Sequence, residues 1–105
     1  MNLSQLRERA AQQITEVDGV RLKKLNAVDG MAYSKQFASV PKDAPPEETV
    51  TAYAFLLSKC VVDENGFATL DSDEGRDALR NLDFATFSKL GEAAIAWNLG
   101  DSKKN

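Results

Sequence analysis

The chain contains no histidine, and this absence narrows the chemistry open to it. Histidine is the usual general base near neutral pH, the commonest metal ligand and the partner that activates a serine or cysteine nucleophile. Paired carboxylates or a lysine could still act in catalysis, but the sequence singles out no such pair. We therefore expect a protein that is not an enzyme and that carries no cofactor and no metal.

Cysteine and basic runs are also scarce. The single cysteine, Cys60, excludes an intrachain disulfide, which fits a reducing cytoplasm. The 16 acidic residues outnumber the 13 basic ones, and no basic run exceeds two residues. Because a phosphate backbone requires a basic footprint, we expect neither nucleic-acid binding nor attachment to an anionic membrane. The amino-terminal residues lack the apolar segment of a secretory signal, and no apolar run approaches the roughly 20 residues that span a bilayer.

Binding motifs for calcium and phosphate are missing as well. An EF-hand loop begins on an oxygen ligand five residues before its invariant glycine. Before Gly66 and Gly75 that place is occupied by Val61 and Leu70, which have no side-chain oxygen. The chain has no glycine-rich phosphate loop either. We interpret the two segments as a turn and the start of a helix.

One serine is similar to the modified serine of phosphopantetheine carrier proteins, because Ser72 follows Leu70-Asp71 just before a predicted helix. Carrier proteins place leucine or methionine directly after that serine, whereas Asp73 follows here. We interpret Ser72 as a helix cap and keep the carrier protein as an alternative. Treatment with a phosphopantetheinyl transferase would test this alternative, because a carrier protein gains the mass of the attached phosphopantetheine group.

The remaining composition is that of one folded domain. Hydrophobic residues make up 43% and charged residues 28% of the 105 residues, which argues against a wholly disordered chain. A chain of this length buries roughly 60–68% of the surface of its unfolded form, enough for a single core. We predict one α-rich domain over residues 1–100, with a linker at 40–48 inside it and a disordered tail at 101–105.

Apolar residues recur at helical spacing in five segments. We predict helices over residues 3–13, 26–39, 47–61, 72–82 and 84–99. Pro46 is expected as the first residue of the third helix, and Gly100 is expected to end the last one. Side-chain oxygens at the helix starts are expected to cap the free N–H groups, namely those of Ser4, Asn26, Ser72 and Asp83.

Two dipeptides indicate tight turns. Asp18-Gly19 lies between β-branched residues and predicts a β-hairpin over residues 14–25, because both positions tolerate positive φ. Asn65-Gly66 predicts a turn or a two-stranded ribbon within residues 61–70. The fold class expected is therefore α+β and predominantly α-helical, with four to five helices and a short hairpin in the N-terminal half.

Several large apolar side chains lie off the main helical stripes. The second helix is apolar on two faces, with Val28 and Met31 on one and Tyr33 and Phe37 on the other. A helix of this kind is either sandwiched in a core or presents one face to a partner. Each of these large side chains could belong to the core. Several of them together in one small protein favour an interaction surface. The partner-binding residues that we predict are Tyr33, Phe37, Phe55, Leu90 and Trp97.

The second half of the chain resembles the tail assembly chaperones of long-tailed bacteriophages. Those proteins have a helix, then a short acidic turn like Val-Val-Asp-Glu-Asn-Gly at residues 61–66, and then an acid-rich short helix. Their last helix ends in a signature similar to Trp97-Asn98-Leu99-Gly100. The first half is also similar, because a strand at residues 19–23 precedes the helical start at 25–29.

The resemblance implies a non-catalytic, largely helical protein of the host cytoplasm that is absent from the mature virion. It implies that the chain binds the tape measure protein, recruits tail tube subunits and self-associates as a homo-oligomer. Members of the family commonly have a longer frameshifted product, and Lys104-Asn105 is compatible with a slippery A-AAA-AAC heptamer in the gene. The alternative is another small phage interaction protein, such as a minor structural component or an inhibitor of a host factor.

Overall fold

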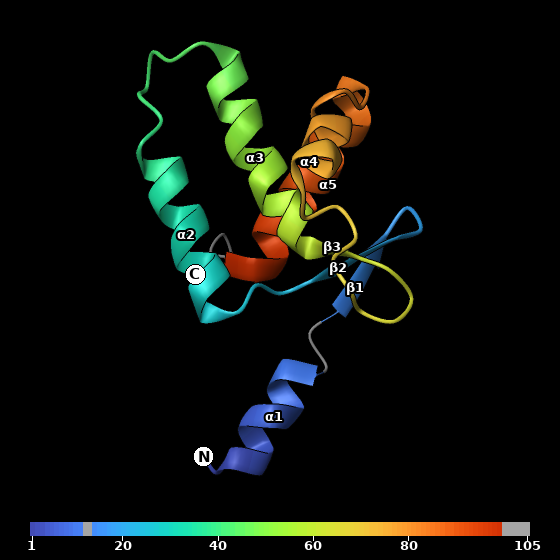
Figure 1. Cartoon of the computed structure of the whole chain (residues 1–105). Coiled ribbons are helices and arrows are strands. Elements are labelled where there is room, and N and C mark those ends of the chain that lie inside the picture. Colours follow the sequence, from blue (N-terminus) through green and yellow to red (C-terminus); the bar gives the residue numbers. More distant parts are fainter. Residues whose placement is uncertain (12–13, 100–105) are drawn as a thin grey trace.

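Five helices and a three-stranded antiparallel sheet form the computed structural model of the protein, which describes residues 1–11 and 14–99 (Figure 1). The helices are α1 (Leu3–Ala11), α2 (Ala27–Ala38), α3 (Pro46–Cys60), α4 (Asp73–Arg80) and α5 (Phe84–Leu99). The strands are β1 (Ile14–Val17), β2 (Val20–Lys23) and β3 (Val61–Val62). The predicted class, α+β with mostly helices and an early hairpin, is confirmed. The predicted last residues of the first helix, the helix-ending Gly100 and the tail at 101–105 lie outside the described residues.

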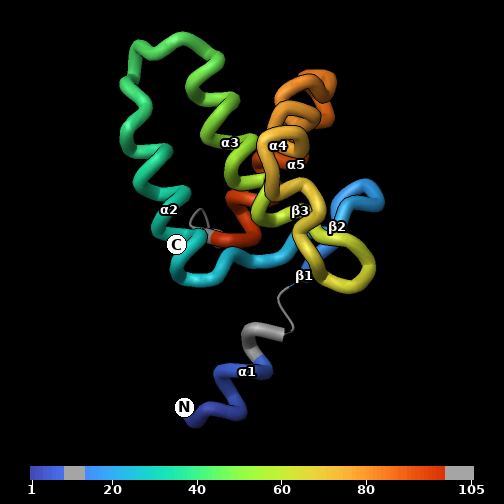
Figure 2. Tube along the Cα trace, viewed as in Figure 1, coloured from blue at the N-terminus to red at the C-terminus, as the bar shows by residue number. Residues whose placement is uncertain are grey.

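Helix α3 is the element around which the others pack. Helices α2, α4 and α5 and the sheet all contact it, as Figures 1 and 2 show. Its side chains Leu56, Leu57 and Cys60 are at most 1% exposed and form the middle of the core. The helix begins at Pro46, as predicted, because proline has no N–H to lose in the first turn.

The predicted hairpin is present, and its turn has the expected conformation. Asp18 and Gly19 have φ of 51° and 80°, which is the pattern of a two-residue turn with both residues left-handed. Strands β1 and β2 pair from Ile14 opposite Lys23 to Val17 opposite Val20.

The segment after α3 departs from the predicted ribbon. Strand β3 does not fold back on itself but pairs with β2, with Val61 opposite Leu22. The arms around Asn65-Gly66 are too short to form a ladder, whereas β2 offers an unpaired edge next to the end of α3. The predicted turn is present, with Gly66 at φ 85°. The Asp63 carboxylate stabilises this turn by accepting from the N–H groups of Asn65 and Phe67 at 2.8 and 3.0 Å.

Three of the four predicted helix caps are confirmed. Side-chain oxygens of Asn26, Ser72 and Asp83 accept hydrogen bonds from backbone N–H groups three residues later, at 2.8–3.0 Å. The prediction for Ser4 is wrong, because Asn2 caps α1 in its place. The Asn2 and Gln5 side chains each accept from the other's N–H, at 2.8 and 2.9 Å. This reciprocal box satisfies two donors at once.

The start of α4 lies so close to the preceding loop that only glycine fits. A Cβ added at Gly75 would meet the backbone of Leu70, with its Cα and carbonyl carbon 2.6 Å away and the carbonyl oxygen closer still. We predict that Gly75→Ala lowers the free energy of unfolding by about 1–3 kcal/mol, the usual cost of overpacking against atoms that cannot move aside. Urea unfolding followed by circular dichroism measures this change.

Gly30→Ala is the matched control, because the added Cβ would have only Leu25 Cβ near it, at 4.0 Å. Alanine is favoured over glycine inside a helix by about 1 kcal/mol, so this variant should be unchanged or more stable. Equal effects of the two substitutions would contradict the close approach at Gly75.

Candidate functional site

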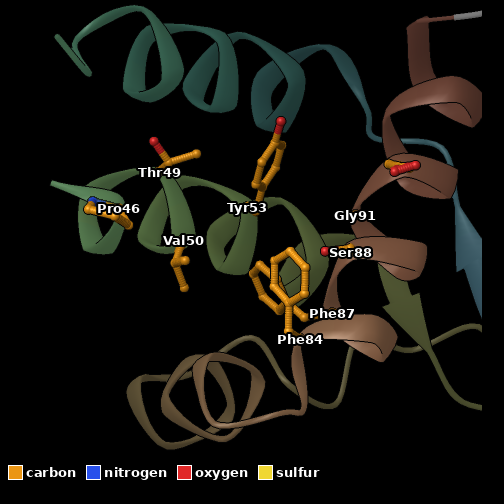
Figure 3. Close-up of a pocket in the computed structure, with 9 residues that line it drawn as sticks. Pro46, Thr49, Val50, Tyr53, Phe84, Phe87, Ser88 and Gly91 are labelled. Carbon is orange, nitrogen blue, oxygen red and sulfur yellow. The ribbon is translucent and has the colours of Figure 1, made fainter. Parts of the chain in front are cut away.

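An open groove lies between the first halves of α3 and α5 (Figure 3). Its volume is about 460 Å³, within the range of sites that accept several side chains of a ligand. Most of its lining is apolar, with Pro46, Val50 and Tyr53 from α3 and Phe84, Phe87 and Gly91 from α5. The groove therefore has the size and character of a docking site for apolar side chains.

Two phenylalanines at the start of α5 line the groove: Phe87 is buried and Phe84 is exposed. Asp83 fixes the start of the helix by accepting from the N–H of Thr86 at 3.0 Å. One turn apart on the same face, Phe87 is 8% exposed and Phe84 is 84% exposed. A large exposed ring beside an apolar groove is a typical anchor of a protein interface.

A row of aromatic rings braces α2 against α3 beside the groove. Tyr53 points toward α2 in Figure 3, and its ring centroid lies 5.7 Å from that of Phe37. Phe37 lies 5.8 Å from Tyr33 in turn. Tilted rings at this separation attract one another, so the row holds α2 in place.

One acidic residue lines the groove, and two more lie nearby in the chain. Glu92 lines the groove, and Glu47 and Glu48 lie beside Pro46 in the first turn of α3, all three exposed. Within residues 1–11 and 14–99 none of these carboxylates has an ion-pair partner. The neighbouring Lys89 is paired with Asp18 at 2.8 Å. Glu92 therefore gives the groove a negative charge that a basic partner could neutralise.

The five predicted partner-binding residues do not form one surface, and none of them lines the groove. Tyr33 and Leu90 are 8% and 5% exposed and belong to the core. Phe37 is 41% exposed but also contacts the two tyrosines of the aromatic row.

The other two predicted residues are partly buried and covered by lysines. Lys59 lies over the Phe55 ring, 5.6 Å from its centroid, and Lys24 lies over Trp97 at 4.9 Å. Cation–π contacts of this kind protect a ring from water without removing it from the surface. These two residues therefore lie at the edge of the core and not at the groove.

Several strongly exposed apolar side chains of the packed domain are not among the predicted anchors. Val28 and Met31 are 77% and 68% exposed on the outer face of α2, and Phe84 is more exposed still. The helical period shows that α2 has two apolar faces but not which one meets α3. Phe84 shares its face with Phe87, so spacing alone assigns both to the core.

Two titratable groups in the core have shifted pKa values. Burial raises the pKa of the Cys60 thiol to about 11, although Asn98 donates a hydrogen bond to its sulfur at 3.4 Å. Burial also raises the pKa of Tyr33 to about 12. Cys60 is thus a buried thiol and a poor nucleophile near neutral pH.

Asn98 is a polar residue whose structural role the sequence pattern did not reveal. Its side chain accepts from the N–H of Leu25 and donates to the carbonyl oxygen of Ala94 at 2.9 Å, in addition to its contact with Cys60. It therefore joins the end of α5 to the segment before α2 and to the end of α3.

Over the described part of the chain, no three metal-binding side chains gather in one place. Of the helices described here, none combines the length and apolar character needed to cross a bilayer. No family model, curated protein or solved structure matches the chain. Functional inference therefore depends on the groove, its acidic residue Glu92 and the exposed apolar residues.

We predict that the free energy of unfolding falls as the pH rises from 9 to 11. The folded state holds the Cys60 proton more tightly than the unfolded chain does, so alkaline pH favours unfolding. The contribution is fully present below pH 9 and is lost as the pH rises to the folded value near 11. It amounts to about 2–3 kcal/mol, with a further loss from Tyr33 toward pH 12.

Urea titrations at neutral pH and at several alkaline values measure this dependence. Cys60→Ala is the control, since its stability should fall less between pH 9 and 11 whatever its stability at neutral pH. The same alkaline loss in both proteins would show that Cys60 is not its source.

Proposed function

We propose that this protein is a non-catalytic assembly chaperone that holds an amphipathic helix of a larger protein in the α3–α5 groove. One observation supports the proposal most directly: Phe84 is 84% exposed and lines an apolar groove that also contains the acidic Glu92. Exposure of such a ring costs solubility unless a partner covers it. A helix docked in a groove would place one apolar stripe against the lining.

The chemistry of the groove defines the client segment. Val50 and Tyr53 on α3 and Phe84 and Phe87 on α5 are pairs spaced one turn apart, so they suit apolar side chains at helical spacing in the client. Basic residues beside the client's stripe would meet Glu92 and the first turn of α3. Such contacts speed association and set orientation more than they raise affinity.

We further propose that the client is the tape measure protein of a long-tailed phage and that the complex forms in the host cytoplasm. A tape measure protein is a long helical chain whose exposed apolar seams favour aggregation, so it needs such a cover. The resemblance of residues 61–66 and of the last helix to tail assembly chaperones supports this identity. The chaperone would leave before the virion is complete.

Recruitment of tail tube subunits requires a second surface. The outer face of α2 is suited to this role, because Val28 and Met31 are 77% and 68% exposed and do not line the groove. Two separate apolar surfaces on one small body would allow the client and a tube subunit to be held at the same time.

Phe84→Asp should lower binding to the tape measure protein about tenfold or more, because it places a charge where the client's apolar stripe would lie. The test co-expresses the chain with the product of the longest reading frame downstream of its gene. The amount of that product kept soluble and co-purified is then compared between variants.

Phe67→Asp is the matched control. Phe67 is also exposed, at 69%, but lies in the loop after β3 and away from the groove lining. Both variants should keep the thermal midpoint of the wild type. If both variants recover the same amount of tape measure protein, the groove is not the client site. Finding the chain in purified virions would favour a structural component instead of a chaperone.

A further inference from the structure

Helix α1 stands apart from the rest of the molecule. In Figures 1 and 2 it extends away from the sheet, and it has no substantial packing against any other element of the described chain. Leu3 and Leu6, one turn apart, are 61% and 51% exposed. A helix of nine residues is marginal in water on its own, so an apolar surface elsewhere is needed to stabilise it.

The charge of α1 is complementary to that of the groove. Its sequence contains Arg7 and Arg9 and one acidic residue, Glu8, in a chain whose net charge is −3. The groove combines an apolar lining with the exposed carboxylate of Glu92. An apolar stripe and a basic flank, both of which α1 has, are the two features that this groove would favour in a partner.

The length of α1 also matches the length of the groove. Nine helical residues extend about 13 Å at 1.5 Å per residue. The part of α3 that lines the groove runs from Pro46 to Tyr53, which is roughly 10 Å on the same rise. Leu3 and Leu6 can therefore both lie within the groove along its length.

The position of α1 relative to the groove of its own molecule favours the groove of a second copy. The turn of the hairpin faces α5, through Asp18 and Lys89, whereas Ile14 lies at the other end of β1, about 10 Å away at the usual strand rise. Only residues 12 and 13 separate Ile14 from α1. Helix α1 leaves the body at the sheet end, opposite the end of α3 that lines the groove (Figure 1).

We propose that α1 of one copy occupies the α3–α5 groove of a second copy, with Leu3 and Leu6 against Phe84 and Arg7 facing Glu92. Because α1 and the groove lie at opposite ends of one molecule, an antiparallel pair fills both grooves and closes with two-fold symmetry. The inference rests on the proposed function only in sharing its groove. Self-association closes that groove until a client displaces α1.

A charge exchange across the interface tests the proposal on the pure protein. In Arg7→Glu and in Glu92→Arg, like charges meet at both contacts of the pair, so each variant alone should dimerise about tenfold more weakly. In an equimolar mixture, a pair made of one copy of each variant has one native contact and one contact in which both charges are reversed. Opposite charges then meet at both contacts. The mixture should therefore recover wild-type association, measured by sedimentation velocity over a range of concentrations.

Recovery on mixing distinguishes exchange between copies from docking of α1 on its own body, because only an intermolecular contact joins the two variants. Leu6→Asp and Phe84→Asp should each give monomers, and Phe67→Asp should remain like the wild type. A wild-type protein that is monomeric at every soluble concentration, or variants that fail to recover on mixing, would overturn the proposal.

Client binding separates this inference from the proposed function. Leu3→Asp/Leu6→Asp should abolish self-association and still co-purify with the tape measure protein, because its groove is intact. If self-association depends on α1 but no client binds, the proposed function fails and the inference stands. If the client binds but the pure protein never associates, the inference alone fails.

Discussion

Helix α3 is packed unequally along its length, and the rest of the structure depends on this inequality. Toward its end, Leu56, Leu57 and Cys60 are enclosed by the sheet and the neighbouring helices. Its first turn is exposed, with Glu47 and Glu48 favoured there by the positive end of the helix dipole. The closed end supplies the burial that stabilises the domain, and the open end leaves the groove.

The groove shares part of its lining with the core, because Phe87 belongs to the buried cluster and Val50 and Tyr53 pack against it. The buried cluster includes Leu22 of β2 and Leu79 of α4, neither of which lines the groove. Phe84 contributes little burial to the domain, so a partner explains its large apolar ring better than the fold does. The deep lining of the groove therefore contributes to stability, whereas the exposed Phe84 remains available to the proposed partner.

Local features of this fold follow from neighbouring residues and could be predicted. The Asp18-Gly19 turn, the Asn26, Ser72 and Asp83 caps and the start of α3 at Pro46 each depend on a few adjacent residues. The cap of α1 cannot be predicted in this way, because both Asn2 and Ser4 are good cap residues and only the structure shows that Asn2 takes the role.

Features that depend on distant contacts could not be predicted in this way. The pairing of β3 with β2 joins residues far apart in the chain, and so does the contact of Asn98 with Leu25. The same holds for the candidate site. Helical period identifies the two apolar faces of α2, but only packing on α3 decides that Tyr33 lies inside and Met31 outside.

The bridging side chain of Asn98 has a consequence for how the molecule opens. Because it ties Leu25, Cys60 and Ala94 together, amides near the start of α2 and the ends of α3 and α5 should exchange with solvent deuterium as one cooperative unit. Helix α1 lies outside that unit and exchanges independently of it. A segment bound at the open end of α3, as proposed, could then associate and dissociate while the closed end keeps its protection.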